Sequence, residues 1–123
     1  MLLKKLDRGV YEKEVIKSGG LALLCFFQNC ISHGETVIAI DELSRQFEFV
    51  RFYTAEEEAL GFFFGKFQFL GTPVFIFFAN GFERGRLMGT ASIERLSVFI
   101  EKNIGKANEQ WQGQAGIKIV SRA

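Results

Sequence analysis

The sequence has little proline, cysteine, histidine or tryptophan: it contains two cysteines and a single residue of each of the other three types. With 48% hydrophobic and 24% charged residues, its composition excludes collagen-like, disordered and low-complexity chains. Two cysteines are too few for a disulfide-stabilised scaffold. The longest apolar runs, LALLCFF and PVFIFFA, are far shorter than the ~20 residues that a membrane-spanning helix needs. A chain of 123 residues with this composition is expected to form one hydrophobic core.

The chain also lacks an excess of charge of either sign. Fifteen Lys and Arg residues face fourteen Asp and Glu residues, which leaves a net charge of +1. Nucleic-acid binding needs a concentrated basic surface, so we expect no nucleic-acid partner. The N-terminal stretch MLLKKLDRG becomes charged too early for the apolar core of a signal peptide. These features predict a cytoplasmic protein without a membrane partner.

The two cysteines, Cys25 and Cys30, are expected to be free thiols. If LALLCFF is a strand, the two Cα atoms lie up to roughly 16 Å apart at ~3.3 Å per residue. A disulfide requires less than about 7 Å. Free thiols are typical of a reducing compartment. In the middle of an apolar strand, Cys25 is expected to be an inert core residue.

The residue pattern predicts strands that alternate with helices and then a hairpin. Asp7 is a candidate N-cap, Gly19-Gly20 a helix stop, and Asn80-Gly81 a two-residue hairpin turn. The seven apolar residues at 21–27 are typical of a central strand buried on both faces. The expected order is a helix from 8 to 18, a strand at 21–27, a helix from 31 to 47, a strand at 47–54, a helix within 56–67, strands at 74–78 and 83–88, and a helix at 92–104. This order indicates an α/β domain.

A polar and glycine-containing segment follows from Gly105. We therefore expect a domain over residues 1–104 and a C-terminal extension over 105–123. Within the extension, residues 117–120 alternate enough to form an edge strand or to dock on the domain, and Trp111 is a candidate to pin it there.

Four motifs in this order resemble the thioredoxin family over residues 1–104. They are LALLCFFQNC before a helix, Gly71-Thr72-Pro73, the Asn80-Gly81 turn, and Gly89. The resemblance implies a thioredoxin fold, in which a central mixed β-sheet is flanked by helices. It places Cys30 at the nucleophilic cysteine and makes Pro73 a cis-proline beside the active site. It assigns substrate contacts to the motif and to the two facing loops: Ile31, Thr72, Pro73 and Gly89.

The same resemblance identifies what this chain has replaced. The family's W-C-G-P-C motif reads Asn29-Cys30-Ile31-Ser32-His33, so a histidine stands in the position of the second cysteine. Leu24 occupies the position of the family's buried aspartate, and Arg51 that of the lysine that pairs with it. Without a second thiol at the site, release of a mixed disulfide needs an external thiol.

Alternatives remain for the two candidate catalytic residues, Cys30 and His33. Cys30 is either a reactive thiolate at a helix start or a small apolar residue without chemistry. Residues three apart on a helix face the same way, so the side chains of Cys30 and His33 would lie close together. His33 then either exchanges a proton with the thiol or is a residue at the helix start without a role. Acyl transfer would need a third group to orient His33, and none is evident. One histidine and one nearby cysteine cannot complete a four-ligand zinc site, so we expect no metal and no cofactor.

The sequence thus predicts thiol-disulfide chemistry through a single reactive cysteine. The expected partner is a thiol- or disulfide-bearing protein or a small thiol, and the alternative is a thioredoxin-fold protein-binding module without redox activity. The aromatic residues at 62–64, 67 and 69 exceed what one helix face buries. One or two of these rings are therefore expected to form an exposed patch for a partner or a homodimer.

Overall fold

The fold is a five-stranded mixed sheet between two layers of helices. A computed structural model describes residues 3–28, 33–69 and 71–115. The strand order is β1-β3-β2-β4-β5. Strands β1, β3 and β2 run parallel to one another, and β4 runs antiparallel to both of its neighbours, β2 and β5. The strands are β1 (Leu3–Lys5), β2 (Leu21–Phe27), β3 (Val50–Glu56), β4 (Val74–Ala79) and β5 (Phe82–Met88).

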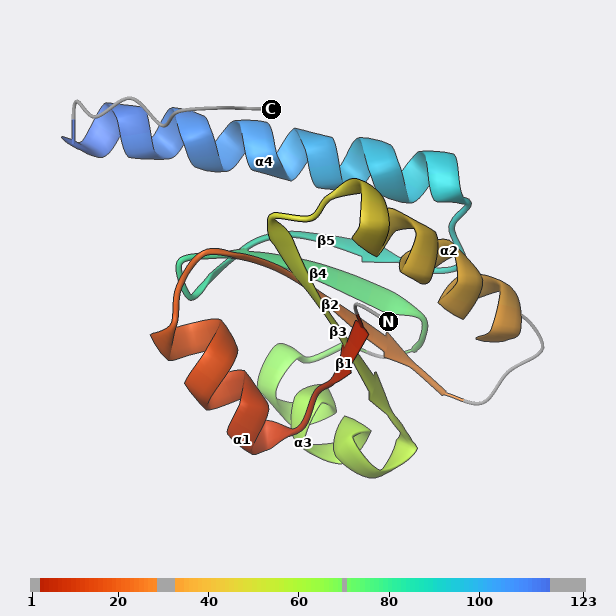
Figure 1. Cartoon of the computed structure of the whole chain (residues 1–123). Helices are drawn as coiled ribbons and strands as arrows, with labels where there is room; N and C mark the ends of the chain where they lie inside the picture. Colours follow the sequence, from red (N-terminus) through yellow and green to blue (C-terminus); the bar gives the residue numbers. More distant parts are fainter. Residues whose placement is uncertain (1–2, 29–32, 70, 116–123) are drawn as a thin grey trace.

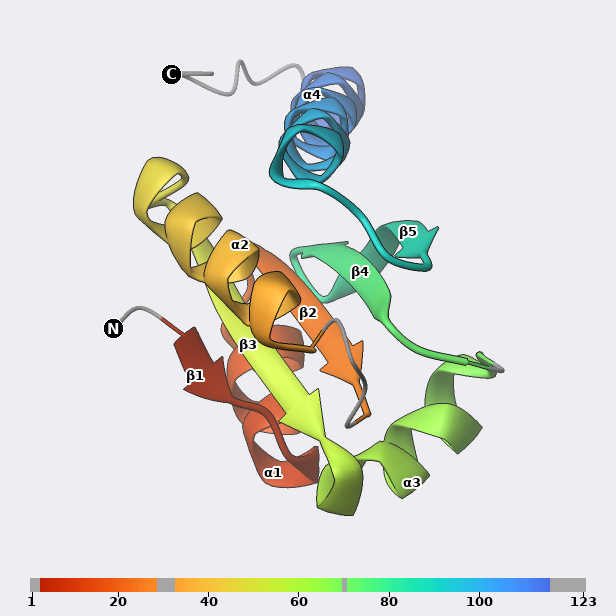
Figure 2. The same ribbon diagram turned by 90° about the vertical axis from the view of Figure 1, so that its right-hand side faces the viewer.

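Helices cover both faces of the sheet (Figures 1 and 2). One face packs against α1 (Arg8–Val10), its π-helical continuation η1 (Tyr11–Lys17) and α3 (Glu57–Phe67). The other face packs against α2 (His33–Gln46) and α4 (Ile93–Ala115). Each face therefore has its own hydrophobic core, and the sheet separates the two.

Strand β2 lies at the centre, as its unbroken apolar run predicts. Ala22, Leu24 and Phe26 belong to the core under α3, whereas Leu23, Cys25 and Phe27 belong to the core under α2 and α4. Successive side chains of a strand point to opposite faces, so a strand covered on both sides has no polar positions. The mixed α/β sheet with flanking helices is confirmed.

Several expected helix ends and turns are also present. The Asp7 carboxylate accepts a hydrogen bond from the Val10 N–H (2.8 Å) and caps α1. Gly19 (φ +73°) and Gly20 (φ +78°) end η1, and Asn80 and Gly81 form the β4–β5 turn with φ angles of +52° and +84°. A Cβ atom on Gly81 would lie 2.9 Å from the backbone oxygen of Ile16, so glycine is required there for space as well as for conformation.

The expected exposed aromatic patch on α3 is wrong. Phe63, Phe67 and Phe69 are buried, and Phe62 and Phe64 pack partly buried against the same core. Tyr11 of η1 explains the difference, because its ring contacts those of Phe62, Phe63 and Phe67 at centroid distances of 5.6–6.3 Å. The exposed phenylalanines among the described residues are instead Phe49 and Phe82.

Three element boundaries differ from expectation. The short edge strand β1 was not expected, because its sequence LKK has no apolar alternation. β3 begins at Val50 rather than Phe47, since Glu48 and Phe49 form a turn closed by the Val50 N–H and the Phe47 carbonyl (3.0 Å).

The third boundary is the end of α4. The helix passes Gly105 without a break and ends at Ala115, since a single glycine costs a helix only about 1 kcal/mol. The edge strand expected at 117–120 lies outside the described residues, and the boundary between domain and extension stays a prediction. Within the described residues, no helix combines the length and apolar character needed to cross a membrane.

Candidate functional site

Three segments distant in sequence meet at the carboxyl end of β2. The Gln28 N–H, just after β2, donates a hydrogen bond to the Thr72 hydroxyl oxygen (3.3 Å). The Thr72–Pro73 peptide bond is cis, the isomer that the resemblance implies. The Pro73 carbonyl accepts a hydrogen bond from the Gly89 N–H (2.8 Å). These contacts bring Thr72, Pro73 and Gly89 together beside the segment that leads to Cys30.

The loop residues at this site offer backbone to solvent. Pro73 is buried, whereas Gly71 and Gly89 are exposed and Thr72 is half-buried. Gly89 has a φ of +94°, and among the described residues other than its chain neighbours no atom lies within 4 Å of the position that a Cβ would take. A side chain there is disfavoured by conformation rather than by crowding.

The predicted nucleophile is not among the described residues. Cys30 and Ile31 lie outside them, so their roles stay predictions. α2 begins at His33, so the backbone of His33 is at the helix N-terminus, where N–H groups lack intrahelical partners. In sequence, Cys30 is three residues after the end of β2 and three before this helix.

The assignment of Arg51 to the site is not supported by its contacts. Its guanidinium donates to the backbone carbonyls of Glu14 (2.5 Å) and Gly19 and to the Tyr53 hydroxyl (3.3 Å). Arg51 lies near the beginning of β3, at the end of the sheet opposite Thr72. Leu24 is fully buried and apolar, so the position of the family's aspartate offers Arg51 no carboxylate. Arg51 instead binds backbone carbonyls within η1 and just after it.

A polar cluster at that far end of the sheet was not expected from sequence. The Tyr53 hydroxyl donates to the Glu14 carboxylate (3.0 Å), which also pairs with Lys4. The hydrogen bond from Lys4, with help from Tyr53, lowers the pKa of Glu14. The three groups lie far apart in the sequence, on β1, η1 and β3. No local sequence pattern therefore predicts that they meet.

Cys25 is unsuited to thiol chemistry. Its side chain is 0% exposed, and burial alone raises the pKa of its thiol far above the ordinary range. The thiolate is the nucleophilic form, so Cys25 stays protonated and unreactive. The prediction that it is an inert core residue is supported by both observations.

Replacing Cys25 with serine is expected to destabilise the fold. The new hydroxyl would lie between β2 and α2 without water, at a cost of about 1–3 kcal/mol. Chemical denaturation followed by circular dichroism measures this loss. Cys25→Ala is the matched control, since it removes the sulfur without adding a polar group. Equal stability of Cys25→Ser and the wild type would contradict the placement of Cys25 in the core.

A groove next to Gly89 was also missed by sequence reasoning. It has a volume of about 280 Å³ and lies between α2 and the segment that joins β5 to α4. Ile38 of α2 lines it and is 62% exposed. Met88, beside Gly89, is likewise exposed. An outward-facing apolar residue at helical spacing is the only signal that the sequence offers for such a groove.

The described residues hold no group of three or more histidine, cysteine, aspartate or glutamate side chains arranged for a metal ion.

Comparison with protein-family models gives no match, and comparison with curated protein sequences gives none either. Comparison with solved structures finds the crystal structure of Chlamydomonas reinhardtii thioredoxin f2, which is 17% identical to this chain. The match covers 81% of this chain and 94% of that chain, with a TM-score of 0.73. At this identity the likeness concerns the fold alone. The chain adopts the thioredoxin fold.

Proposed function

We propose that this protein performs thiol-disulfide exchange through Cys30 as its single reactive thiol. The observation that supports the proposal is the convergence of Thr72, Pro73 and Gly89 beside the carboxyl end of β2. The sequence reaches Cys30 three residues beyond that strand and enters α2 three residues later. A thiol close to a helix N-terminus is favoured as thiolate by the partial positive charge there.

The reaction is a nucleophilic exchange at sulfur. The Cys30 thiolate attacks one sulfur of a substrate disulfide, a new S–S bond forms, and the substrate's own S–S bond breaks. Its second sulfur leaves as a thiolate that takes a proton from water or from His33. The product is a mixed disulfide between Cys30 and the substrate.

Release of this mixed disulfide requires a thiol from outside the chain. That thiol, as thiolate, attacks the substrate sulfur of the mixed disulfide, so that Cys30 leaves as thiolate and the external thiol retains the substrate as a new disulfide. His33 stands where a dithiol protein has its resolving cysteine, and the buried Cys25 has no access to solvent. A reducing, cytoplasmic environment would supply the external thiol.

The Thr72–Pro73 edge suits an extended polypeptide as substrate. Thr72 is half-buried and is held by Gln28, while the exposed backbone at Gly71 and Gly89 flanks it. Extended peptides bind such edges through main-chain hydrogen bonds, with affinity from the backbone and specificity from neighbouring side chains. A protein disulfide or a peptide-containing thiol therefore fits the site better than a compact small molecule.

The pH dependence of thiol alkylation tests the proposal. We expect the rate for Cys30 to follow a pKa well below the ~8.5 of a free cysteine, because the helix N-terminus stabilises the thiolate. The control is Cys30→Ser, which should lose all fast alkylation, since Cys25 is buried with a raised pKa.

Two results would count against this function. A Cys30 that titrates like free cysteine, or does not react, would favour a thioredoxin-fold binding module that retains the Thr72–Pro73 edge without its chemistry. Rapid alkylation that survives in Cys30→Ser would locate the reactive thiol elsewhere.

A further inference from the structure

One groove next to the candidate site plays no part in the exchange reaction proposed above. This Ile38 groove lies between Thr36, Ile38 and Ala39 of α2 on one side and the segment 90–93, which leads from β5 into α4, on the other. The start of α2 and the β5–α4 connection lie at the same end of the molecule, opposite the β4–β5 turn (Figure 1). The groove is therefore at the same end of the sheet as the Thr72–Pro73 edge.

The Ile38 groove adjoins the loop that flanks the candidate site. Thr90, which lines the groove, directly follows Gly89. The Gly89 N–H is hydrogen-bonded to the Pro73 carbonyl (2.8 Å), and both Gly89 and Thr90 are exposed. A polypeptide that lies along the Thr72–Pro73 edge therefore comes close to the groove.

The surface of the groove is uncharged and largely apolar. Ile38 is 62% exposed and belongs to neither hydrophobic core, whereas Ala91 and Ile93 pack partly buried against the core under α2 and α4. None of the described residues that line the groove carries a charge. A charged side chain placed there would lose hydration without gaining a counter-charge, while an apolar side chain would be stabilised by leaving water.

The groove has the size of one side chain rather than of a whole small molecule. Its volume is about 280 Å³. Pockets for drug-sized ligands span about 300–1,000 Å³ and enclose most of the ligand. Extended peptides that bind a backbone edge obtain their specificity from neighbouring pockets for side chains. The groove is thus suited to one side chain of a polypeptide whose backbone lies on the Thr72–Pro73 edge.

We infer that the Ile38 groove selects substrates that carry an apolar side chain near the reacting cysteine. The inference rests on the proposed function and adds its substrate class. Ile38 lies five residues after His33, where α2 begins, which is about 7.5 Å along the helix axis at ~1.5 Å per residue. An extended chain covers this distance in two to three residues at ~3.3 Å each. The substrate is accordingly a protein disulfide with an aliphatic residue two or three positions from its cysteine, and Ile38 is a specificity-determining residue.

Exchange rates with two matched peptides test the inference. Each peptide carries one cysteine as a mixed disulfide with thiopyridine, and the release of thiopyridine is followed by absorbance. One peptide has leucine at the second and third positions on both sides of the cysteine. The other has asparagine there, which has a similar shape but a polar amide. After each rate is divided by that with dithiothreitol, the wild type should react at least roughly tenfold faster with the leucine peptide, because its apolar side chain leaves water in the groove.

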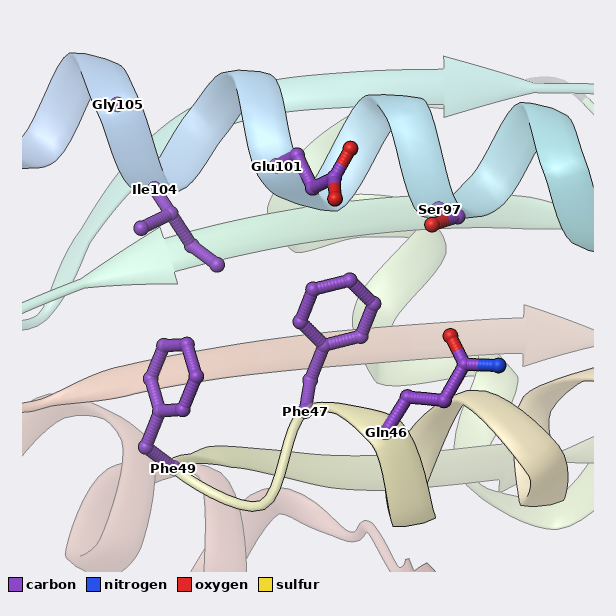
Figure 3. A pocket seen from close by; sticks show the side chains of 7 residues that line it. All are labelled: Gln46, Phe47, Phe49, Ser97, Glu101, Ile104 and Gly105. Carbon is purple, nitrogen blue, oxygen red and sulfur yellow. The ribbon is translucent and has the colours of Figure 1, made fainter. Parts of the chain in front are cut away.

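Ile38→Ser should remove most of this preference, since it takes away the apolar wall of the groove without adding a charge near the thiol. The matched control is Phe49→Ser. Phe49 is 50% exposed and lines a separate groove of about 490 Å³ between the end of α2 and α4 (Figure 3). It directly precedes Val50, which pairs with Leu21 at the beginning of β2. Phe49 therefore lies at the opposite end of the sheet, and its replacement should leave the preference unchanged.

Hydroxyethyl disulfide, which has no side chain to place in the groove, separates the inference from the proposed function. The wild type and Ile38→Ser should react with it equally fast. Equal rates for the two peptides in the wild type, or a full preference that survives in Ile38→Ser, would overturn the inference and leave the exchange at Cys30 intact. No reaction of Cys30 with any of these disulfides would overturn the proposed function and this inference with it.

Discussion

Replacing Phe63 with alanine is expected to lower the free energy of unfolding by about 3–5 kcal/mol. The Phe63 side chain is 0% exposed and is the centre of the aromatic core under α3. Its ring lies 5.1 Å from that of Phe26, 5.7 Å from that of Tyr11 and 6.0 Å from that of Phe67, between centroids. The substitution leaves a cavity that these surrounding rings can fill only in part. For a domain with a total stability of about 5–15 kcal/mol, this loss is large.

Denaturant unfolding measures the effect. The matched control is Phe82→Ala, which removes the same ring from a position that is 66% exposed and is expected to change stability by less than about 0.5 kcal/mol. A loss below about 1 kcal/mol for Phe63→Ala would contradict the two-core arrangement, because it would mean that α3 does not pack on the sheet through this residue.

The second large effect concerns catalysis. With dithiothreitol as the terminal reductant, the wild-type protein should barely accelerate the reduction of a test protein disulfide over background. Its site lacks a resolving thiol, so each mixed disulfide persists until dithiothreitol attacks it from solution. Replacing His33 with cysteine rebuilds a CxxC motif at the start of α2, and an intramolecular disulfide and measurable turnover should then appear. Turnover should remain slow, because the buried Leu24 supplies no carboxylate to deprotonate the second thiol.

Mass spectrometry after mild oxidation checks the first step, through the loss of two hydrogen atoms from His33→Cys. Leu24→Asp added to His33→Cys should raise the rate further while costing stability, because it buries an acid. The control is His33→Ser, which should form no such bond. If His33→Cys forms no disulfide, Cys30 does not face the start of α2. Turnover as fast as that of a dithiol protein would instead mean that another sulfur of this chain, that of Cys25, reaches Cys30.

Much of the fold was predictable because its central elements have strong local patterns. The run of apolar residues in β2 has no polar position, which is the pattern of a strand covered on both faces. Asn80-Gly81 defines a hairpin since both residues tolerate positive φ angles. Asp7 and Gly19 mark the two ends of one helix through capping chemistry that depends only on neighbouring residues.

The errors arose where tertiary contacts decide the structure. β1 is a strand because its backbone pairs with β3, and its two lysines suit an exposed sheet edge rather than showing any alternation. The phenylalanine rings of α3 are too numerous for one helix face to bury, but Tyr11 from η1 packs among them and helps to cover them. α4 continues past Gly105 because a single glycine lowers helix stability only modestly. The change to a polar, glycine-containing composition had suggested that the helix ends there.

The candidate site was predictable in part. Thr72, Pro73 and Gly89 were identified by a resemblance, and their contacts place them together. Arg51 was misassigned because a position in a strand does not reveal where a long side chain turns, and its guanidinium reaches back to η1. The groove lined by Ile38 required the spatial juxtaposition of α2 and the β5–α4 connection, which no local pattern encodes.

The formation of a mixed disulfide with a small disulfide reagent tests the central claim most directly. The folded protein is incubated with oxidised glutathione, and the adducts are located by peptide mass spectrometry before and after addition of excess glutathione. The account predicts one adduct, on Cys30, none on the buried Cys25, and full reversal by the external thiol. No adduct on Cys30, or an intramolecular Cys25–Cys30 disulfide in its place, would contradict it.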